Sequence, residues 1–261
     1  MTNQAVVSEI REGVAWLYLN KPDDLNAIGK DLLEALTKAL HEAEENQAVR
    51  VAVLTGKGRA FCAGANLKEL LEYVENPQME DSLFDKSEQL FVTLERFKKP
   101  LIAAINGVTV AGGLEIAMTC DFMIASDQAQ IGDGHANFGV IPGAGGAVKL
   151  PRKIGMNHAK YLLFTGEMMS AKKMEQYGLV EEVVAHENLE TRVQEIALKI
   201  AEKSPLVLKT MKQLANDGVE QPLEIALKQE LLALKVHTQS YDLSEGLRAF
   251  SEKRKPNFKG Y

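Results

Sequence analysis

Short apolar runs alternate with segments of helical periodicity over the first 130 residues, and this order constrains the fold more than any other feature of the sequence. Residues 13–20, 50–55 and 101–105 are predicted as strands, because they are short, rich in apolar side chains and bounded by turn-forming residues. Residues 30–46 and 81–98 repeat apolar side chains every three or four positions, as amphipathic helices do. This alternation builds crossover units around a largely parallel sheet, so the sequence predicts an α/β fold.

The second half of the chain is dominated by helical patterns. Residues 121–125 and 129–131 are the last predicted strands, and after Gly146 the apolar side chains recur mainly at helical spacing. We therefore predict two regions. Residues 1–200 form a core that carries the functional site, and residues 201–261 form a helical C-terminal region, with no Gly-, Ser- or Pro-rich linker between them.

Composition and charge exclude several classes of protein. With 261 residues, 46% of them hydrophobic, the chain can bury one sizeable core. The formal net charge of −6 argues against a nucleic-acid-binding protein, which needs a basic surface. No apolar run approaches the ~20 residues of a membrane-spanning helix, and no signal-peptide core is recognisable. The two cysteines, Cys62 and Cys120, lie far apart, which favours a reducing, cytoplasmic compartment.

Glycine is concentrated in one stretch. Nine of the twenty glycines lie between Gly107 and Gly146, although neither a phosphate-binding loop nor a dinucleotide fingerprint is matched there. Gly112 is predicted to lie at the start of a short helix, whose unpaired N–H groups can stabilise an oxyanion. The alternative is a turn that merely packs the helix on the sheet. Glu115, a carboxylate among apolar neighbours on the same helix, favours a functional site.

A second loop has the composition of a ligand-binding segment. Residues 59–66 follow the strand that ends at Thr55 and are rich in small side chains, which allow backbone N–H groups to approach a ligand closely. Cys62 lies in this loop without an obvious base nearby. We therefore expect a packed thiol there rather than a nucleophile.

Together, these segments resemble the crotonase (enoyl-CoA hydratase/isomerase) superfamily. The matching motifs follow family order and spacing over nearly the whole chain: Leu19-Asn-Lys-Pro22, Phe61-Cys-Ala-Gly-Ala-Asn66, Lys99-Pro-Leu-Ile-Ala-Ala-Ile-Asn-Gly107, Ala111-Gly-Gly-Leu-Glu115, Ile141-Pro-Gly-Ala-Gly-Gly146 and Glu252-Lys-Arg-Lys255. Each motif alone is weak, whereas the ordered set is strong. The resemblance implies a crotonase-like spiral of repeated β-β-α turns with a helical C-terminal trimerisation region, and hence a homotrimer or a dimer of trimers.

The resemblance also implies the chemistry and part of the site. It points to an acyl-CoA thioester as the substrate, with no metal and no further cofactor, and to an enolate stabilised by two backbone N–H groups. Those donors fall on Ala65 and Gly112, and the first of the two glutamates of the family's hydratases falls on Glu115. The second falls on His135, which departs from the family pattern, and Asn66 replaces the usual aspartate.

The departure at His135 leaves two interpretations open. Imidazole titrates near neutrality, with an ordinary pKa of about 6.5, so a Glu115/His135 pair is chemically competent for acid/base work. Alternatively, His135 only hydrogen-bonds its loop. Asp133, two residues away, could orient the imidazole if the loop folds back.

Three further positions are implied as contacts of the coenzyme A substrate. They are Ala63, Lys68 and Lys253, the last by reaching a neighbouring chain's ligand, although either lysine could equally be solvated. The polar segment 72–85 is expected to form a wall of the acyl pocket, with a shape that varies with the acyl group.

The leading interpretation is an enoyl-CoA hydratase, which adds water syn across a 2,3 double bond with Glu115 and His135 as acid/base groups. An isomerase that moves one proton between C2 and C4 is the second. Thioester hydrolysis or carbon–carbon cleavage is the third. A non-catalytic homologue is disfavoured by the acidic composition and the intact Glu115.

Overall fold

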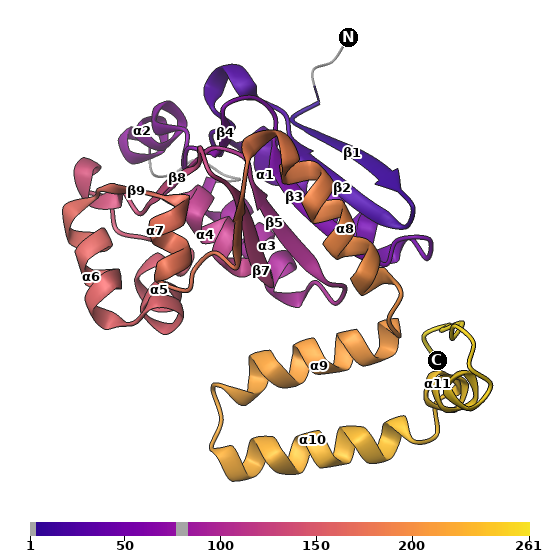
Figure 1. The fold of residues 1–261 in the computed structure, drawn as a ribbon. Coiled ribbons are helices and arrows are strands. Elements are labelled where there is room, and N and C mark those ends of the chain that lie inside the picture. The colour runs from indigo at the N-terminus through magenta and orange to yellow at the C-terminus, as the bar shows by residue number, and fades with distance from the viewer. Residues whose placement is uncertain (1–3, 77–82) are drawn as a thin grey trace.

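The computed structural model describes residues 4–76 and 83–261 and arranges their strands in two sheets (Figure 1). Within these residues, the larger sheet has six strands in the order β1-β2-β3-β5-β7-β10, and the smaller has four in the order β4-β6-β8-β9. The larger sheet comprises β1 (Val6–Arg11), β2 (Val14–Leu19), β3 (Val51–Gly56), β5 (Leu101–Ile105), β7 (Phe122–Ser126) and β10 (Glu182–Val184). The smaller comprises β4 (Ala60–Cys62), β6 (Val108–Val110), β8 (Gln130–Gly132) and β9 (Met168–Ser170).

The larger sheet is mostly parallel, as the alternation of strands and helices predicts. Strands β2, β3, β5, β7 and β10 pair in parallel, whereas β1 pairs antiparallel with β2. Every residue of β2, β3 and β5 is buried, because helices cover both faces of the sheet. The β1–β2 hairpin turns at Glu12 and Gly13, whose positive φ angles of 50° and 82° suit a two-residue hairpin loop.

A repeated unit connects the two sheets. Strand β3 of the larger sheet is followed closely by β4 of the smaller one, β5 is followed by β6, and β7 by β8. The first two pairs each lead into helices that return the chain to the larger sheet, and the third returns to it at β10 after α5, α6, strand β9 of the smaller sheet and α7. The chain therefore advances as a spiral of β-β-α turns (Figure 1). The predicted spiral is confirmed.

Helices cover the larger sheet on both faces. One face carries α1 and α3, which pack with Leu17 and Leu19 of β2, and the opposite face carries α8, which packs with Trp16 and Tyr18. The helices are α1 (Lys30–Glu45), α2 (Leu67–Glu75), α3 (Leu83–Arg96), α4 (Gly112–Thr119), α5 (Gly146–Ile154), α6 (Met156–Thr165), α7 (Ala171–Gln176), α8 (Leu189–Ala201), α9 (Pro205–Gly218), α10 (Leu223–His237) and α11 (Tyr241–Ser251). Short 3-10 turns occur at η1 (Pro22–Asp24), η2 (His135–Phe138) and η3 (His186–Asn188).

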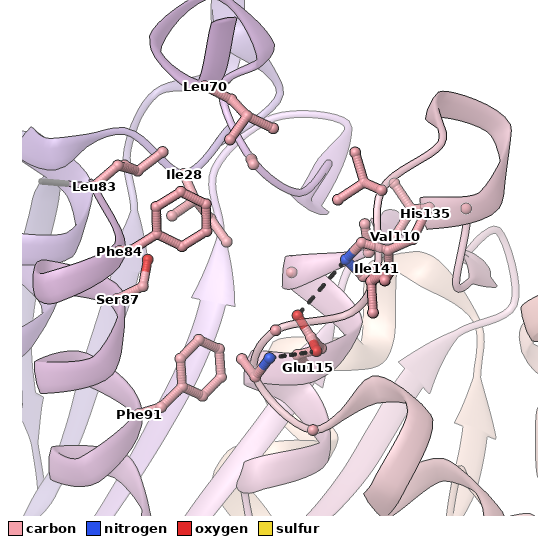
Figure 2. A pocket seen from close by; sticks show the side chains of 18 of the residues that line it. Ile28, Leu70, Leu83, Phe84, Ser87, Phe91, Val110, Glu115, His135 and Ile141 are labelled. Atoms are coloured by element: carbon pink, nitrogen blue, oxygen red, sulfur yellow. Dashed lines mark hydrogen bonds and ion pairs between the residues drawn. The ribbon is translucent and has the colours of Figure 1, made fainter. Parts of the chain in front are cut away.

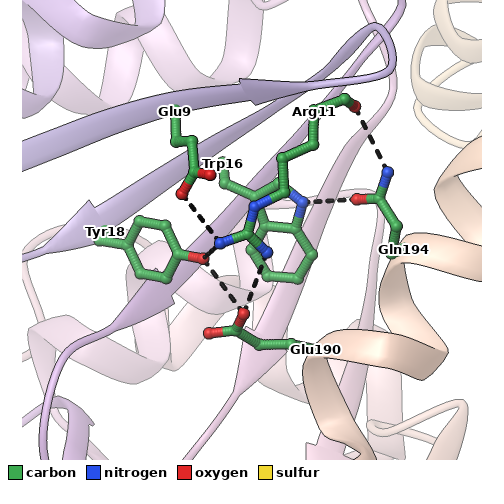
Figure 3. A network of polar contacts seen from close by, with 6 residues as sticks. All are labelled: Glu9, Arg11, Trp16, Tyr18, Glu190 and Gln194. Carbon is green, nitrogen blue, oxygen red and sulfur yellow. Dashed lines mark hydrogen bonds and ion pairs between the residues drawn. The ribbon is translucent and has the colours of Figure 1, made fainter.

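A polar network fastens helix α8 to the N-terminal hairpin (Figure 3). The Arg11 guanidinium donates to Glu190 at 3.0 Å and to the Tyr18 hydroxyl at 2.8 Å. The indole N–H of the buried Trp16 donates to Gln194 Oε1 at 2.7 Å, which satisfies a polar group that would be costly to bury alone. The network is remote from the pocket described below, and we assign it a structural role.

Helices α9, α10 and α11 extend away from the two sheets as an arm (Figure 1). Side-chain caps start two of them, because Ser204 accepts from Val207 N–H before α9 and Ser240 accepts from Leu243 N–H before α11. The domain boundary between residues 200 and 201 stays a prediction. None of the helices in the described part of the chain is long and apolar enough to cross a membrane.

Candidate active site

A pocket of about 760 Å³ lies between helix α3 and the segment 134–149 (Figure 2). Most of its wall is apolar, as in most sites that bind small molecules. The apolar side chains labelled in Figure 2 are Ile28, Leu70, Leu83, Phe84, Phe91, Val110 and Ile141. Leu83 and Phe84 come from the predicted wall segment 72–85, of which residues 77–82 lie outside the described residues.

The two predicted oxyanion donors meet at this pocket. Ile28 N–H donates to Gly64 O at 2.7 Å and Ile28 O accepts from Asn66 N–H at 2.8 Å, so the N–H of Ala65 points away from this bridge. Gly112 is the first residue of α4, and a Cβ built on it would lie 3.9 Å from Ala65 N. Neither Ala65 N–H nor Gly112 N–H has a hydrogen-bond acceptor among the described residues, and both residues line the pocket.

The residue before Gly112 is held in an unfavourable backbone conformation. Ala111 has φ of 52° and ψ of −122°, a region that suits glycine rather than a residue with a Cβ. The chain tolerates this because Gly64 lies directly against the segment: a Cβ on Gly64 would come within 3.0 Å of Ala111 Cβ. Strain of this kind concentrates at functional sites, where it fixes the direction of backbone N–H groups.

Glu115 lies one turn into α4 and is only 3% exposed. Its Oε1 accepts two backbone hydrogen bonds, from Ala144 N–H and Gly146 N–H, each at 2.8 Å. These bonds come from the glycine-rich segment that precedes α5, so the carboxylate also holds that segment in place. The second oxygen, Oε2, remains directed toward His135.

His135 lies on the same wall of the pocket as Glu115 and faces it (Figure 2). Its Nε2 lies 3.8 Å from Glu115 Oε2, too long for a direct hydrogen bond, while its Nδ1 lies 3.1 Å from both oxygens of Asp133. Burial lowers the pKa of His135, and this is the largest single effect. The hydrogen bond to Asp133 and the negative charges of Asp133 and Glu115 together outweigh it, so the pKa of the imidazole lies above its usual value.

The geometry brings together the parts that enolate chemistry needs. Two free N–H groups can polarise a carbonyl oxygen, and a carboxylate and an imidazole stand beside them in a largely apolar pocket. The only hydrogen bonds of the His135 ring go to Asp133 of its own loop, while Nε2 faces Glu115 without a direct hydrogen bond, so both sequence interpretations of His135 stay open.

The predicted coenzyme A contacts lie in different places. Ala63 lines the pocket beside Ala65. Lys68 is exposed on α2 and is not a lining residue, and Lys253 is exposed beyond α11, on the arm that Figure 1 shows far from α2. Asn66 caps α2 by accepting Lys68 N–H at 3.1 Å, so the residue that departs from the family pattern has a structural contact here.

Some functional groups escaped the sequence analysis. The backbone donors Ala144 and Gly146 carried no side-chain signal, although the glycine-rich motif in which they lie was recognised. Helix α3 supplies an apolar wall of the pocket that includes Phe91, but its sequence pattern predicts only an ordinary amphipathic helix. Cys62 was predicted correctly as a packed thiol: it is fully buried, and this burial raises its pKa to about 12.

Comparisons with known proteins agree with this geometry. The family model described as enoyl-CoA hydratase/isomerase matches residues 9–261. The chain is 36% identical to a crotonyl-CoA hydratase from Syntrophomonas wolfei over 261 residues, 99% of each protein, and 35% identical to a 2,3-dehydroadipyl-CoA hydratase from Escherichia coli over 258 residues, again 99% of each. A crystal structure of an enoyl-CoA hydratase from Bacillus anthracis, 37% identical, superposes with a TM-score of 0.91 over 99% of this chain and 100% of that one. The chain therefore belongs to the enoyl-CoA hydratase/isomerase family of enzymes, the crotonase superfamily that its sequence resembles.

Proposed function

We propose that the protein is an enoyl-CoA hydratase that adds water syn across the 2,3 double bond of an enoyl-CoA thioester. The observation that carries this proposal is the pairing of Glu115 Oε2 with His135 Nε2 at 3.8 Å, beside two unpaired backbone N–H groups. The named hydratases among the relatives support the same reaction. The reaction needs no cofactor, because it neither oxidises nor reduces the substrate.

In the proposed reaction the thioester oxygen accepts hydrogen bonds from Ala65 N–H and Gly112 N–H. Glu115 takes a proton from water, and the hydroxyl oxygen forms a bond to C3 while the electron pair of the double bond moves onto the thioester oxygen. The enolate then takes a proton at C2 from Nε2 of the protonated His135. Each N–H donor of such a site contributes roughly 3 kcal/mol to stabilising the developing charge.

After one turnover, the base Glu115 and the acid His135 are both in the opposite protonation state from the one in which they started. Glu115 then carries the proton that it took from water, and His135 is neutral. The 3.8 Å between Oε2 and Nε2 is short enough that a small side-chain movement, or one bridging water, returns the proton. Glu115 and His135 lie on the same wall of the pocket (Figure 2). This placement suits a syn addition, in which the hydroxyl group and the proton reach the same face of the double bond.

The remaining pocket accounts for the substrate class. Its apolar wall suits the acyl chain, and the exposed Lys68 is placed on α2, next to the oxyanion loop, where a phosphate or the nucleotide of coenzyme A can reach it. Lys253 is too distant from the pocket of its own chain, so we propose that it acts in the pocket of a neighbouring chain. Charge-reversed variants of each lysine should raise the KM for an enoyl-CoA in a salt-dependent way.

The same proposal includes assembly as a homotrimer or a dimer of trimers. Helix α10 exposes large apolar side chains that a lone chain leaves in water. These are Leu223, Ile225, Leu227, Leu231, Leu232, Leu234 and Val236. Sedimentation velocity measures the assembly directly, and a monomer at micromolar concentration would contradict this part of the proposal.

One assay separates the candidate reactions. Hydration of crotonyl-CoA removes the ultraviolet absorbance of the conjugated thioester, and we expect the purified protein to remove it rapidly. The matched variant is His135→Glu, which restores the family's glutamate pair. No reaction by the natural protein, together with activity gained by His135→Glu, would mean that the scaffold is a hydratase's but the natural reaction is another one.

Hydrolysis of an acyl-CoA thioester is the second candidate, and the Asp133–His135 contact favours it, because a carboxylate-supported imidazole is a general base for water. Hydrolysis releases the thiol of coenzyme A, which a disulfide reagent detects. Hydration releases none, and isomerisation of a 3-enoyl-CoA increases the absorbance instead. The three readouts use the same protein preparation and the same coenzyme A scaffold.

A further inference from the structure

We propose that Asp133 is a positioning residue of this site: it fixes the proton of His135 on Nδ1 and so presents Nε2 to Glu115 and to the substrate. This inference rests on the proposed function for its catalytic consequence, although its structural part can be tested without any substrate.

The position of Asp133 is the first support. It follows strand β8, is 1% exposed, and folds back on the loop so that both carboxylate oxygens lie 3.1 Å from His135 Nδ1. Its Oδ1 also accepts the backbone N–H of His135 at 3.3 Å. The turn depends on Gly134, whose φ of 70° is left-handed and whose Cβ, if present, would come within 2.6 Å of Val110.

The chemistry of the two groups sets the tautomer. An ionised carboxylate only accepts hydrogen bonds, so a contact with Nδ1 requires the proton on that nitrogen. Nε2 then carries the lone pair of the neutral imidazole or the second proton of the charged form. It is therefore the atom that gains and loses a proton, and it is the atom 3.8 Å from Glu115.

The surrounding charges explain why an imidazole suits this position. A Cβ built on Gly146 would lie 3.1 Å from Asp133 Oδ2 and 3.2 Å from Glu115 Oε1, so the two buried carboxylates flank the same glycine. Asp133 on the histidine's own loop and Glu115 on α4 are the charged groups that shift the titration of His135. A glutamate at position 135 would place a third carboxylate between two others, which like-charge repulsion disfavours.

A local structural role would predict something different. If Asp133 only stabilised the loop through the backbone N–H of His135, asparagine would replace it, because its side-chain oxygen accepts the same bond. Asparagine also carries an NH₂ donor, and turning that donor toward Nδ1 would move the imidazole proton to Nε2. Asp133→Asn therefore separates positioning of the proton from support of the loop.

The first measurement uses the unaltered protein, labelled with ¹⁵N at its five histidines, with the His135 signal assigned by its loss in His135→Gln. Nitrogen chemical shifts report which ring nitrogen carries the proton. We expect the Nδ1–H tautomer in the neutral form, and the Nε2–H tautomer in Asp133→Asn. An Nε2–H tautomer in the unaltered protein would overturn the inference whatever reaction the enzyme performs.

The second measurement is kinetic: we expect Asp133→Asn to change kcat in opposite directions in the unaltered protein and in a His135→Glu background. Asp133→Asn should lower kcat by about 100-fold or more with little change in KM. The substrate still binds, but the imidazole of His135 is in the wrong tautomer and is inactive. In a His135→Glu background the same substitution should raise kcat, since it removes one of three clustered carboxylates. The matched control is Asp127→Asn, an exposed aspartate that accepts the backbone N–H of His186 outside the pocket and should leave both backgrounds unchanged.

The outcomes are distinguishable. Equal losses of kcat from Asp133→Asn in both backgrounds would show a structural residue and overturn the inference. Absence of hydration in the unaltered protein, combined with the expected tautomers, would refute the proposed function but leave the positioning of His135 by Asp133 intact.

Discussion

The substitution Glu115→Gln tests the center of the proposed site with the least change of shape. The glutamine oxygen can keep the position of Oε1 and accept the two backbone N–H groups, of Ala144 and Gly146, that now bond the carboxylate at 2.8 Å. Its NH₂ group then occupies the place of Oε2 and faces His135, where it cannot take a proton from water. The variant thus removes the base and keeps the loop.

The structure gives separate magnitudes for activity and stability. Loss of a general base lowers turnover by about 10²–10⁴-fold, which corresponds to roughly 3–5 kcal/mol in the activation free energy. The two hydrogen bonds lose their ionic character, which costs about 1 kcal/mol of stability for each bond. Part of this cost is offset, because a neutral amide is less costly to bury than a carboxylate. We therefore expect Glu115→Gln to lower the free energy of unfolding by about 1–2 kcal/mol.

Glu115→Ala is the comparison that isolates the loop contacts. It leaves both N–H groups without their acceptor and opens a cavity, so we expect about 2–6 kcal/mol of destabilisation, at about 1–3 kcal/mol for each unsatisfied buried group. Both variants should be equally poor hydratases.

The assay combines hydration of crotonyl-CoA, denaturant unfolding and calorimetric binding of butyryl-CoA, which resembles the substrate but cannot react. Glu115→Gln should bind butyryl-CoA within about threefold of the unaltered protein, because the carbonyl contacts come from backbone groups. Near-normal turnover of Glu115→Gln would remove this residue from the mechanism. Equal stability of the two variants would refute the argument from the Ala144 and Gly146 bonds.

Three further predictions follow from the same geometry. Ala111→Gly should raise the free energy of unfolding by about 1 kcal/mol, because relief of the φ 52° conformation exceeds the added chain entropy; an unchanged denaturant midpoint would show that Ala111 is not strained. Cys62, with its pKa raised to about 12 by burial, should be only about 10⁻⁴ thiolate at pH 8 and resist iodoacetamide until the protein unfolds, so rapid alkylation of the native protein would contradict its packing. The raised pKa of His135 means that the folded state binds this proton more tightly than the unfolded chain, so its contribution to stability is complete below the unfolded value of about 6.5 and is lost as the pH rises through the folded value. The difference in unfolding free energy between the unaltered protein and His135→Gln should therefore shrink from pH 5 to pH 9, and a constant difference would exclude the linkage.

Much of the fold could be predicted from local patterns. The predicted strand 101–105 is β5, and the predicted helix 30–46 is α1, one residue shorter, because apolar periodicity follows directly from burial of one helix face or of a whole strand. Strands β4 and β6 escaped prediction. Each has three residues, too few to show an alternation, and forms only because neighbouring turns of the spiral bring the strands into register.

The candidate site divides in a similar way. The sequence pointed to Gly112 and Glu115 through their chemistry, since a helix start and a carboxylate among apolar neighbours are both unusual enough to notice. It could not decide between the two interpretations of His135. Nor could the sequence show that the loop folds back at Gly134 to bring Asp133 against Nδ1, which is a matter of backbone direction rather than of residue type.

By itself, the sequence determined the α/β class, the family and the residue types available for catalysis, because these follow from periodicity and from the order of motifs along one chain. The tertiary structure alone decided which groups meet. Gly112 and Ala65 lie 47 positions apart in the chain, yet both line one pocket, and neither N–H has an acceptor among the described residues. The wall opposite them comes from α3, and Glu115 is held by a loop that begins almost thirty residues later. Such contacts depend on the path of the spiral between the two sheets, and no local pattern of side chains records that path.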